Sequence, residues 1–143
     1  MLSVVDASVV AKWFLPEPHK ENAEKLLREY LTDAIALMAP DLLVVEVGNI
    51  FWKRSTQRGD ITTAQAAESY RHFLSLDIPL HPSSQLASAA LQLALNERRS
   101  MYDMMYIALA EQNGCEFITA DEKLLNSLRK KFSCLRWIGE LEA

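Results

Sequence analysis

The sequence has few of the residues that build disulfide frameworks or metal–thiolate sites. Its 143 residues include 2 cysteines and 3 histidines. Cys115 and Cys134 form no Cys-x-x-Cys pair, and no histidine stands near them at the spacing of metal ligands. We therefore predict two buried, reduced thiols and a cytoplasmic protein.

Long apolar runs and leader sequences are also lacking. The most apolar stretch, residues 34–52, is interrupted by Pro40 and by two acids, so we expect no membrane span. The N-terminus carries no basic leader, and Asp6 and Lys12 interrupt its apolar run, so we expect no signal peptide.

An excess of basic charge is absent as well, because the net charge is −4 at pH 7. At first sight this balance disfavours nucleic-acid binding, which depends on basic side chains. The composition is otherwise that of an ordinary globular domain, with 50% hydrophobic residues, 4 glycines and 5 prolines. The length fits one domain with a sizeable core, so we predict a single domain over residues 1–143.

Apolar segments with strand character alternate with segments of helical periodicity. We predict short strands at residues 2–6, 34–40, 77–82, 115–119 and 134–138. We predict helices over residues 8–14, 23–31, 41–59, 61–76, 84–97, 102–112 and 121–131. Strands separated by helices indicate right-handed crossovers, and hence an α/β domain whose mainly parallel sheet has helices on both faces.

Two finer expectations concern packing within that fold. Pro79 weakens the third strand and suits it to an edge of the sheet. On the helix over residues 84–97 we expect four apolar side chains to face inward: Ala87, Leu91, Ala94 and Leu95.

Four acidic residues occupy positions that a parallel sheet brings to one edge. Asp6 ends the first strand, and Asp121 follows the fourth strand by two residues. Asp103 lies in the first turn of the helix leading to the fourth strand, and Glu46 lies one turn into the helix after the second. Ligands bind such sheets outside the carboxyl ends of the strands.

Each acid also has a purely structural interpretation. Asp103 follows Ser100 at the spacing of a capping box. Asp121 fits the N-cap of the next helix, and Asp6 can accept hydrogen bonds in a turn. Glu46 is harder to explain in this way because its neighbours are apolar, which indicates a partly buried acid.

Three or four carboxylates at one rim would repel one another unless a cation held them. Mg²⁺ and Mn²⁺ both prefer hard oxygen ligands. We therefore predict a catalytic metal site, with supporting roles for nearby polar residues. The predicted ligands are Asp6, Glu46, Asp103 and Asp121, and the supporting residues are Ser8, Asn49 and Thr119.

Basic residues near these acids are candidates for phosphate contacts. The four proposed ligands account for the whole net charge of −4, so the rest of the chain is balanced. We favour Arg98 and Arg99, just before Asp103, and Lys53, which precedes two further candidates, Arg54 and Arg58. The basic run at 129–131 is better explained as solvated surface.

The motifs resemble those of the PIN-domain ribonucleases. The segments "VVDAS", "EVGN", "YDMMYIALAEQNG" and "FITAD" follow one another in the order typical of that family and span essentially the whole chain. Size and motif order are most similar to the VapC-type toxins of bacterial and archaeal toxin–antitoxin pairs. By position, the acidic quartet of the family falls on the four proposed ligands, and Ser8, Asn49 and Thr119 match its polar neighbours.

The resemblance implies a fold, an activity and partners. The fold is a three-layer α/β/α sandwich with a parallel five-stranded sheet. The activity is divalent-metal-dependent cleavage of RNA, an endoribonuclease reaction. The partners are a second copy of the chain, forming a homodimer, and a small antitoxin protein bound to it.

Other functions remain open on the residues alone. A phosphoacceptor domain normally has paired acids after its first strand, whereas "VVDAS" has one. A phosphatase of the haloacid dehalogenase type requires an aspartate two residues after Asp6, where this chain has Ser8. A third alternative is a non-catalytic, metal-stabilised module that holds a partner chain.

Overall fold

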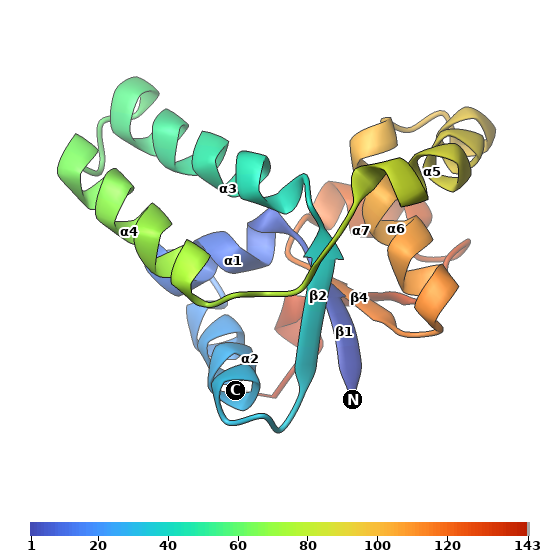
Figure 1. The fold of residues 1–143 in the computed structure, drawn as a ribbon, viewed down its shortest axis with the longest axis horizontal. Coiled ribbons are helices and arrows are strands. Elements are labelled where there is room, and N and C mark those ends of the chain that lie inside the picture. The colour runs from blue at the N-terminus through green and yellow to red at the C-terminus, as the bar shows by residue number, and fades with distance from the viewer. Residues whose placement is uncertain (143) are drawn as a thin grey trace.

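The computed structural model describes residues 1–142 and contains one five-stranded sheet (Figure 1). The strand order is β3-β2-β1-β4-β5, and every neighbouring pair is parallel. The strands are β1 Leu2–Val5, β2 Ala36–Pro40, β3 Leu80–His81, β4 Glu116–Thr119 and β5 Leu135–Trp137. The predicted parallel sheet is therefore confirmed, and β3, with only two residues, lies at its edge as expected.

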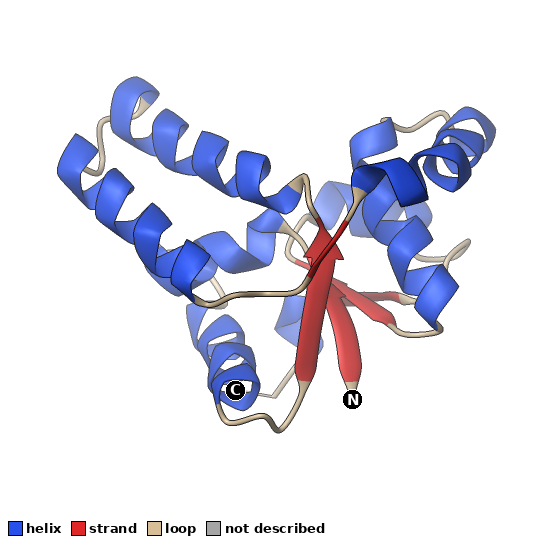
Figure 2. Ribbon diagram, in the orientation of Figure 1, coloured by secondary structure: helices blue, strands red, loops and turns tan. Residues whose placement is uncertain are grey.

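Helices cover both faces of this sheet (Figure 2). They are α1 Ala7–Phe14, α2 Lys20–Leu31, α3 Leu43–Trp52, α4 Thr63–Ser75, α5 Ser83–Glu97, α6 Met101–Asn113 and α7 Glu122–Leu128. Figure 1 shows α1 to α4 on one side of the strands and α5 to α7 on the other. The predicted three-layer α/β/α sandwich is confirmed.

The core lies on both sides of the central strand. Val4 and Val5 of β1 and Phe117 of β4 are fully buried, as is usual for strands covered on both faces. Helix α6 packs against β1, β2 and β4, and every residue from Met104 to Ala110 is buried. A helix buried all round shows little amphipathic periodicity, so its apolar pattern alone did not indicate how deeply it lies.

The expected inward face of α5 was wrong in part. The side chains of Leu91 and Leu95 are 48% and 70% exposed, and the buried residues are Leu86, Ala90 and Ala94. The helix carries apolar residues on two sides, so periodicity did not select between them. The small side chains of the alanines suit close packing against α6, which is the helix that α5 contacts.

The single helix expected over residues 41–59 changes character at its end. After α3, residues Lys53–Gln57 form a π-helix, in which the backbone N–H of Arg58 donates to the carbonyl of Lys53 at 2.9 Å. Gly59 then adopts a left-handed backbone with φ 67°, which glycine reaches without steric cost. Propensity patterns do not distinguish a π-helix from an α-helix.

The next helix begins as the sequence indicated. Thr62 and Gln65 form a reciprocal capping box at the start of α4, with hydrogen bonds of 3.0 and 2.8 Å. Within residues 1–142, no helix is both long enough and apolar enough to cross a membrane.

Candidate active site

A cavity of about 290 Å³ lies at the carboxyl ends of β1 and β4, between α3 and α6. We call it the acidic cavity, because all four predicted acids line it. Seven of the predicted site residues contribute to its wall: Asp6, Ser8, Glu46, Asn49, Lys53, Asp103 and Asp121. Segments more than 110 residues apart in the sequence thus meet at one edge of the sheet (Figure 1).

Asp6 is held by a dense set of hydrogen bonds. It is the N-cap of α1, and its Oδ1 accepts from the backbone N–H groups of Ser8 and Val9 at 3.1 and 3.3 Å. The Ser8 hydroxyl donates to the same oxygen at 2.5 Å, and the Thr119 hydroxyl donates to Oδ2 at 2.6 Å. The cap interpretation and the site interpretation of Asp6 therefore both apply.

Burial makes the negative charge of Asp6 unfavourable. The residue is 8% exposed, and this desolvation raises the pKa of its carboxyl to about 6. Hydrogen bonds from Ser8, Thr119 and Val9 lower the pKa, while the charge of Asp121 raises it. The hydrogen bonds thus offset only part of the desolvation cost.

Two hydroxyls connect the ends of the central strands. Thr119, fully buried at the end of β4, donates to Asp6 and accepts from the backbone N–H of Asp121 at 3.1 Å. Ser8 donates to Asp6 and accepts from the backbone N–H of Ala120 at 2.9 Å. Through these contacts, Ser8 and Thr119 fix the position of Asp6 relative to Asp121.

Asp121 also combines a cap with a place at the site. It is the N-cap of α7, and its Oδ1 accepts from the backbone N–H of Leu124 at 3.1 Å. This bond engages one carboxylate oxygen while the side chain lines the acidic cavity.

Glu46 is positioned by a tyrosine that the sequence analysis missed. The hydroxyl of Tyr106 donates to Oε1 of Glu46 at 2.5 Å. Tyr106 is 3% exposed, and its ring stacks on Phe117 with centroids 5.5 Å apart. A signal was present, because Tyr106 lies three residues after Asp103 and thus on the same helix face.

The charges around this pair favour a protonated phenol. Burial raises the pKa of Glu46, the hydrogen bond from Tyr106 lowers it, and the charge of Asp103 raises it. Burial and the neighbouring Glu46 raise the pKa of Tyr106 well above its ordinary value. The tyrosine therefore remains a hydrogen-bond donor at neutral pH.

Asp103 is paired with a basic residue that we expected to contact phosphate. Nη2 of Arg99 lies 3.5 Å from Oδ2 of Asp103, and Nη1 donates to the Ser127 hydroxyl at 3.3 Å. Burial raises the pKa of Asp103, the charge of Arg99 lowers it, and that of Asp121 raises it. Ser100 makes no side-chain cap bond to α6, so the capping-box interpretation of this pair was wrong.

Arg98 occupies a different place from its neighbour. It caps the C-terminus of α5 with a left-handed backbone (φ 55°), and its side chain is exposed outside the lining of the acidic cavity. The structure therefore brings Arg99, but not Arg98, to the four acids.

The donor set of the acidic cavity fits a hard divalent cation. Its charged side chains are four carboxylates and one lysine, Lys53. Burial raises the pKa of Asp6, Glu46 and Asp103, and the charge of a neighbouring acid raises each of them further. Carboxylate oxygens are the ligands that such cations prefer. The four carboxylates line one cavity, but within residues 1–142 no three acidic, histidine or cysteine side chains lie close enough together to form a metal-binding group. The donor chemistry therefore suits the cation, and binding would have to draw the carboxylates closer together.

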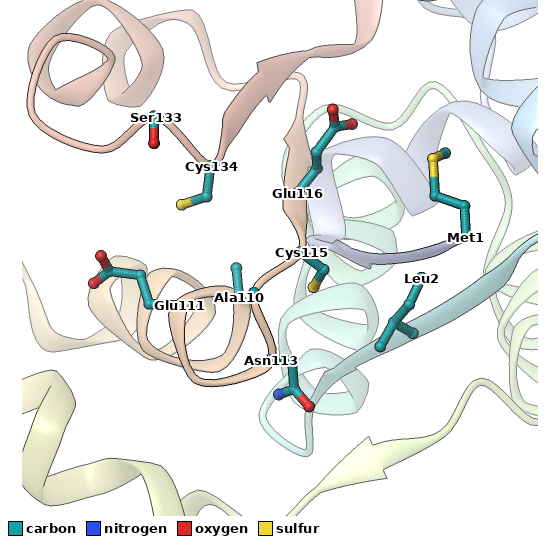
Figure 3. Close-up of a pocket in the computed structure, with 10 residues that line it drawn as sticks. Met1, Leu2, Ala110, Glu111, Asn113, Cys115, Glu116, Ser133 and Cys134 are labelled. Atoms are coloured by element: carbon teal, nitrogen blue, oxygen red, sulfur yellow. The ribbon is translucent and has the colours of Figure 1, made fainter.

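A larger cavity, of about 620 Å³, lies at the amino ends of β1 and β4 and holds both cysteines (Figure 3). Cys115 and Cys134 are unpaired and partly exposed, rather than buried as expected. Burial raises the pKa of the Cys134 thiol to about 11 and also raises that of Cys115, which keeps both protonated at neutral pH. This cavity shares no residue with the acidic cavity.

Fold and site together define a three-layer α/β/α domain with four carboxylates gathered at the carboxyl edge of its parallel sheet. The family model of the PIN domain matches residues 3–130, and the chain belongs to the PIN-domain family.

Two known proteins resemble the chain over most of its length. Ribonuclease VapC3 of Pyrobaculum aerophilum is 34% identical over 127 residues, which cover 87% of this chain and 92% of that protein. The crystal structure of PAE2754, also from Pyrobaculum aerophilum, superposes with a TM-score of 0.68 over 97% of this chain and 93% of that one, at 23% identity. The first match confirms the resemblance to VapC-type proteins, and the second supports the fold.

Proposed function

We propose that this chain is a divalent-metal-dependent endoribonuclease that hydrolyses RNA phosphodiester bonds. We further propose that it is the toxin of a toxin–antitoxin pair. The observation that carries the proposal is the convergence of Asp6, Glu46, Asp103 and Asp121 on one cavity. The relative named Ribonuclease VapC3, 34% identical, supports the choice of RNA as substrate.

The four carboxylates would hold Mg²⁺ or Mn²⁺, chiefly through Asp6 and Asp103 with help from Asp121 and Glu46. A bound cation of this kind lowers the pKa of a coordinated water and stabilises charge on the phosphate and the leaving oxygen. Ser8 and Thr119 keep the Asp6 carboxylate in place by donating to its two oxygens.

Glu46 is the residue proposed to orient the attacking water and to accept its proton. Tyr106 engages Oε1, so Oε2 is the oxygen proposed to take the proton. Burial raises the pKa of Glu46, which brings it closer to the range where a carboxylate is an effective base. Because water rather than the ribose 2′-hydroxyl attacks, the products carry 5′-phosphate and 3′-hydroxyl ends.

Asn49 and Lys53 complete the proposed substrate contacts in the acidic cavity. Asn49 lies three residues after Glu46 on the same face of α3, and both residues line the cavity. The amide of Asn49 offers hydrogen bonds to the sugar–phosphate backbone, and Lys53 offers a positive charge to a phosphate oxygen.

We propose a homodimer that binds a small antitoxin protein. Large apolar side chains are exposed on α3, on α5 and at the start of α6: Val45, Trp52, Leu91, Leu95 and Tyr102. Val45 and Trp52 lie seven residues apart and therefore share one face of α3. Exposed apolar side chains that share a face are typical of protein–protein contacts, and this pair supports the presence of partner chains.

Cleavage of RNA by the purified protein tests the activity. RNA should be cut with Mg²⁺ or Mn²⁺ and spared with EDTA, and Asp103→Asn should abolish cutting. Glu68→Gln, which neutralises an exposed acid on α4, is the matched control and should cut at the wild-type rate. Full activity of Asp103→Asn would show that the metal assignment is wrong.

Two alternatives give different outcomes in related experiments. A non-catalytic interaction module would remain inactive even after any bound partner is removed by denaturation and the protein is refolded. A phosphoacceptor or phosphatase domain would become phosphorylated by small phosphodonors, whereas the proposed ribonuclease would not.

A further inference from the structure

A second cavity, whose charged lining residues are mostly basic, adjoins the acidic cavity. Its volume is about 320 Å³, and it shares Ser8, Ile50 and Lys53 with the acidic cavity. We call it the basic cavity, since four cations line it against one carboxylate, that of Glu17. The four cations are Lys12, Lys53, Arg54 and Arg58.

Two of these cations are built into the fold. Lys12 and Arg54 are only 7% and 9% exposed, and buried charges are costly unless they are paired. Glu17 bridges them, with Oε1 at 3.4 Å from Nζ of Lys12 and Oε2 at 3.0 Å from Nη1 of Arg54. Asp60 lies 2.7 Å from Nε of Arg54 and completes the network. This network gives the cavity a fixed wall.

The other two cations are free to bind an anion. Lys53 and Arg58 are exposed, and neither makes an ion pair within residues 1–142. The four bases are thus balanced by two acids, Glu17 in the cavity wall and Asp60 behind Arg54. The unbalanced positive charge, that of Lys53 and Arg58, lies next to the four carboxylates of the acidic cavity.

The π-helix explains why these bases share one wall. Its hydrogen bonds join residues five apart, so Arg58 lies one turn beyond Lys53 and Arg54. In a continuous α-helix the turn would be shorter, and the same residues would point in more divergent directions. Single π-turns often mark functional sites, and here the turn places Lys53, Arg54 and Arg58 in the lining of the basic cavity.

We propose that the basic cavity binds the RNA phosphate next to the one that is cleaved. This inference rests on the proposed ribonuclease function and adds a binding site to it. An RNA strand carries one negative charge per nucleotide, so a phosphate held at the four acids has a charged neighbour on each side. Lys53 lines both cavities, so the strand would run past this residue from one cavity to the other.

The site is expected to position the strand without reading its sequence, because phosphates are the same at every nucleotide. An acidic peptide also carries the charge to fit the basic cavity. RNA is favoured because its backbone uses both cavities at once, whereas a peptide carboxylate has no role at the four acids.

A coupling experiment between a residue and a phosphate tests the proposal. Arg58→Gln removes one exposed charge, and a methylphosphonate at either phosphate beside the cleaved one removes the charge of the substrate. With all-phosphate RNA, Arg58→Gln should raise KM about fivefold and leave kcat within about twofold of the wild type. The slope of log KM against log salt concentration should fall by about one, since one phosphate contact is lost. With the methylphosphonate on the correct side, the variant should lose nothing further.

Two further variants make the result specific. Arg71→Gln removes an exposed arginine from α4, away from the basic cavity, and should leave KM unchanged. Lys12→Met removes a cation that Glu17 already pairs, so it should raise KM less than Arg58→Gln does, with its melting temperature recorded because Lys12 is nearly buried. The three substrates are the all-phosphate RNA and the two RNAs with a methylphosphonate on one side or the other of the cleaved phosphate. If Arg58→Gln raises KM equally for all three, the proposal is wrong.

Failure of the ribonuclease function has a separate signature. If the wild type cuts no RNA, the anisotropy of a fluorescent single-stranded RNA still reports binding: weaker binding by Arg58→Gln supports the site, and equal binding overturns it. A polyglutamate peptide is the comparison ligand. If Arg58→Gln weakens binding of the peptide but not of RNA, the site belongs to an acidic polypeptide and the proposal is wrong.

Discussion

The phenol oxygen of Tyr106 lies 2.5 Å from Oε1 of Glu46, so a buried tyrosine on α6 holds an acid that projects from α3. The two helices lie on opposite faces of the sheet, and this bond joins them across the acidic cavity. It also stabilises the ionised form of Glu46, since a donated hydrogen bond lowers the pKa of a carboxyl.

Tyr106→Phe should therefore raise the pKa of Glu46. The rise of kcat with pH should move to higher pH, and kcat at neutral pH should fall about tenfold, as expected when a catalytic acid–base group is perturbed. The ring still stacks on Phe117, so the loss of stability should be about 1 kcal/mol.

Tyr102→Phe is the matched control for that experiment, because Tyr102 is exposed on the same helix. It should leave the pH–rate profile unchanged. A profile of Tyr106→Phe that coincides with the wild type would show that the hydrogen bond has no role in proton transfer.

Asp6→Asn should stabilise the metal-free protein at neutral pH. The folded-state pKa of Asp6 is raised to about 6 from an ordinary value of 3.8, so above pH 6 the charged carboxylate costs folding free energy. The folded state takes up its proton first as the pH falls, and the cost disappears below about pH 4. The gain for Asp6→Asn should be about 1–3 kcal/mol at pH 7.5.

Urea unfolding in EDTA at several pH values measures this gain. It should shrink as the pH falls from 6 to 4, while Glu68→Gln, at an exposed position, stays within about 0.5 kcal/mol of the wild type throughout. A gain independent of pH would mean that desolvation of the Asp6 charge is not its cause.

Magnesium should raise the melting temperature of the wild type at pH 7.5. A ligand that binds only the folded state stabilises it, by about 3–6 °C for a protein of this size at ten times the Kd. The Asp6→Ala/Asp103→Ala double variant should show no such rise. Differential scanning fluorimetry with and without EDTA gives both numbers, and an equal rise in the double variant would place the cation elsewhere.

Arg98→Gln and Arg99→Gln should differ although they are neighbours. Arg99 contacts Asp103 and lowers its pKa, so Arg99→Gln should raise the pKa of Asp103. Because a protonated Asp103 binds Mg²⁺ poorly, the Mg²⁺ concentration for half-maximal cleavage should rise, and it should rise more at pH 6.5 than at pH 8. Arg98 lies outside the acidic cavity, and its replacement should leave the Mg²⁺ dependence unchanged. The Mg²⁺ concentration for half-maximal cleavage, measured at both pH values, checks this expectation.

The order of strands and helices was predictable because buried segments require apolar residues, and these give the sequence a recognisable pattern. Val4, Val5 and Phe117 belong to short apolar runs of the kind that parallel strands covered on both faces require. Asp6 and Asp121 were predicted to share an edge because the carboxyl ends of neighbouring parallel strands always do.

Contacts between distant segments were not predictable in the same way. Tyr106 reads as one more apolar residue in "YDMMYIALAEQ", and its bond to Glu46 depends on how α3 and α6 face each other. The network of Arg54 was likewise invisible, since its partners Glu17 and Asp60 come from separate loops. Helix α5 has apolar residues on two faces, and the face that is buried depends on its packing against α6, which the sequence does not reveal.

The π-helix at Lys53–Gln57 holds one residue more than an α-helical turn of the same span. Deleting a single residue from it would let α3 continue as a regular α-helix and rotate everything beyond it by about 100°. Relatives that differ here by one residue would then carry the same basic side chains on another face of the molecule. The length of this turn, as well as the identity of its residues, therefore sets on which face of the molecule the positive charge lies.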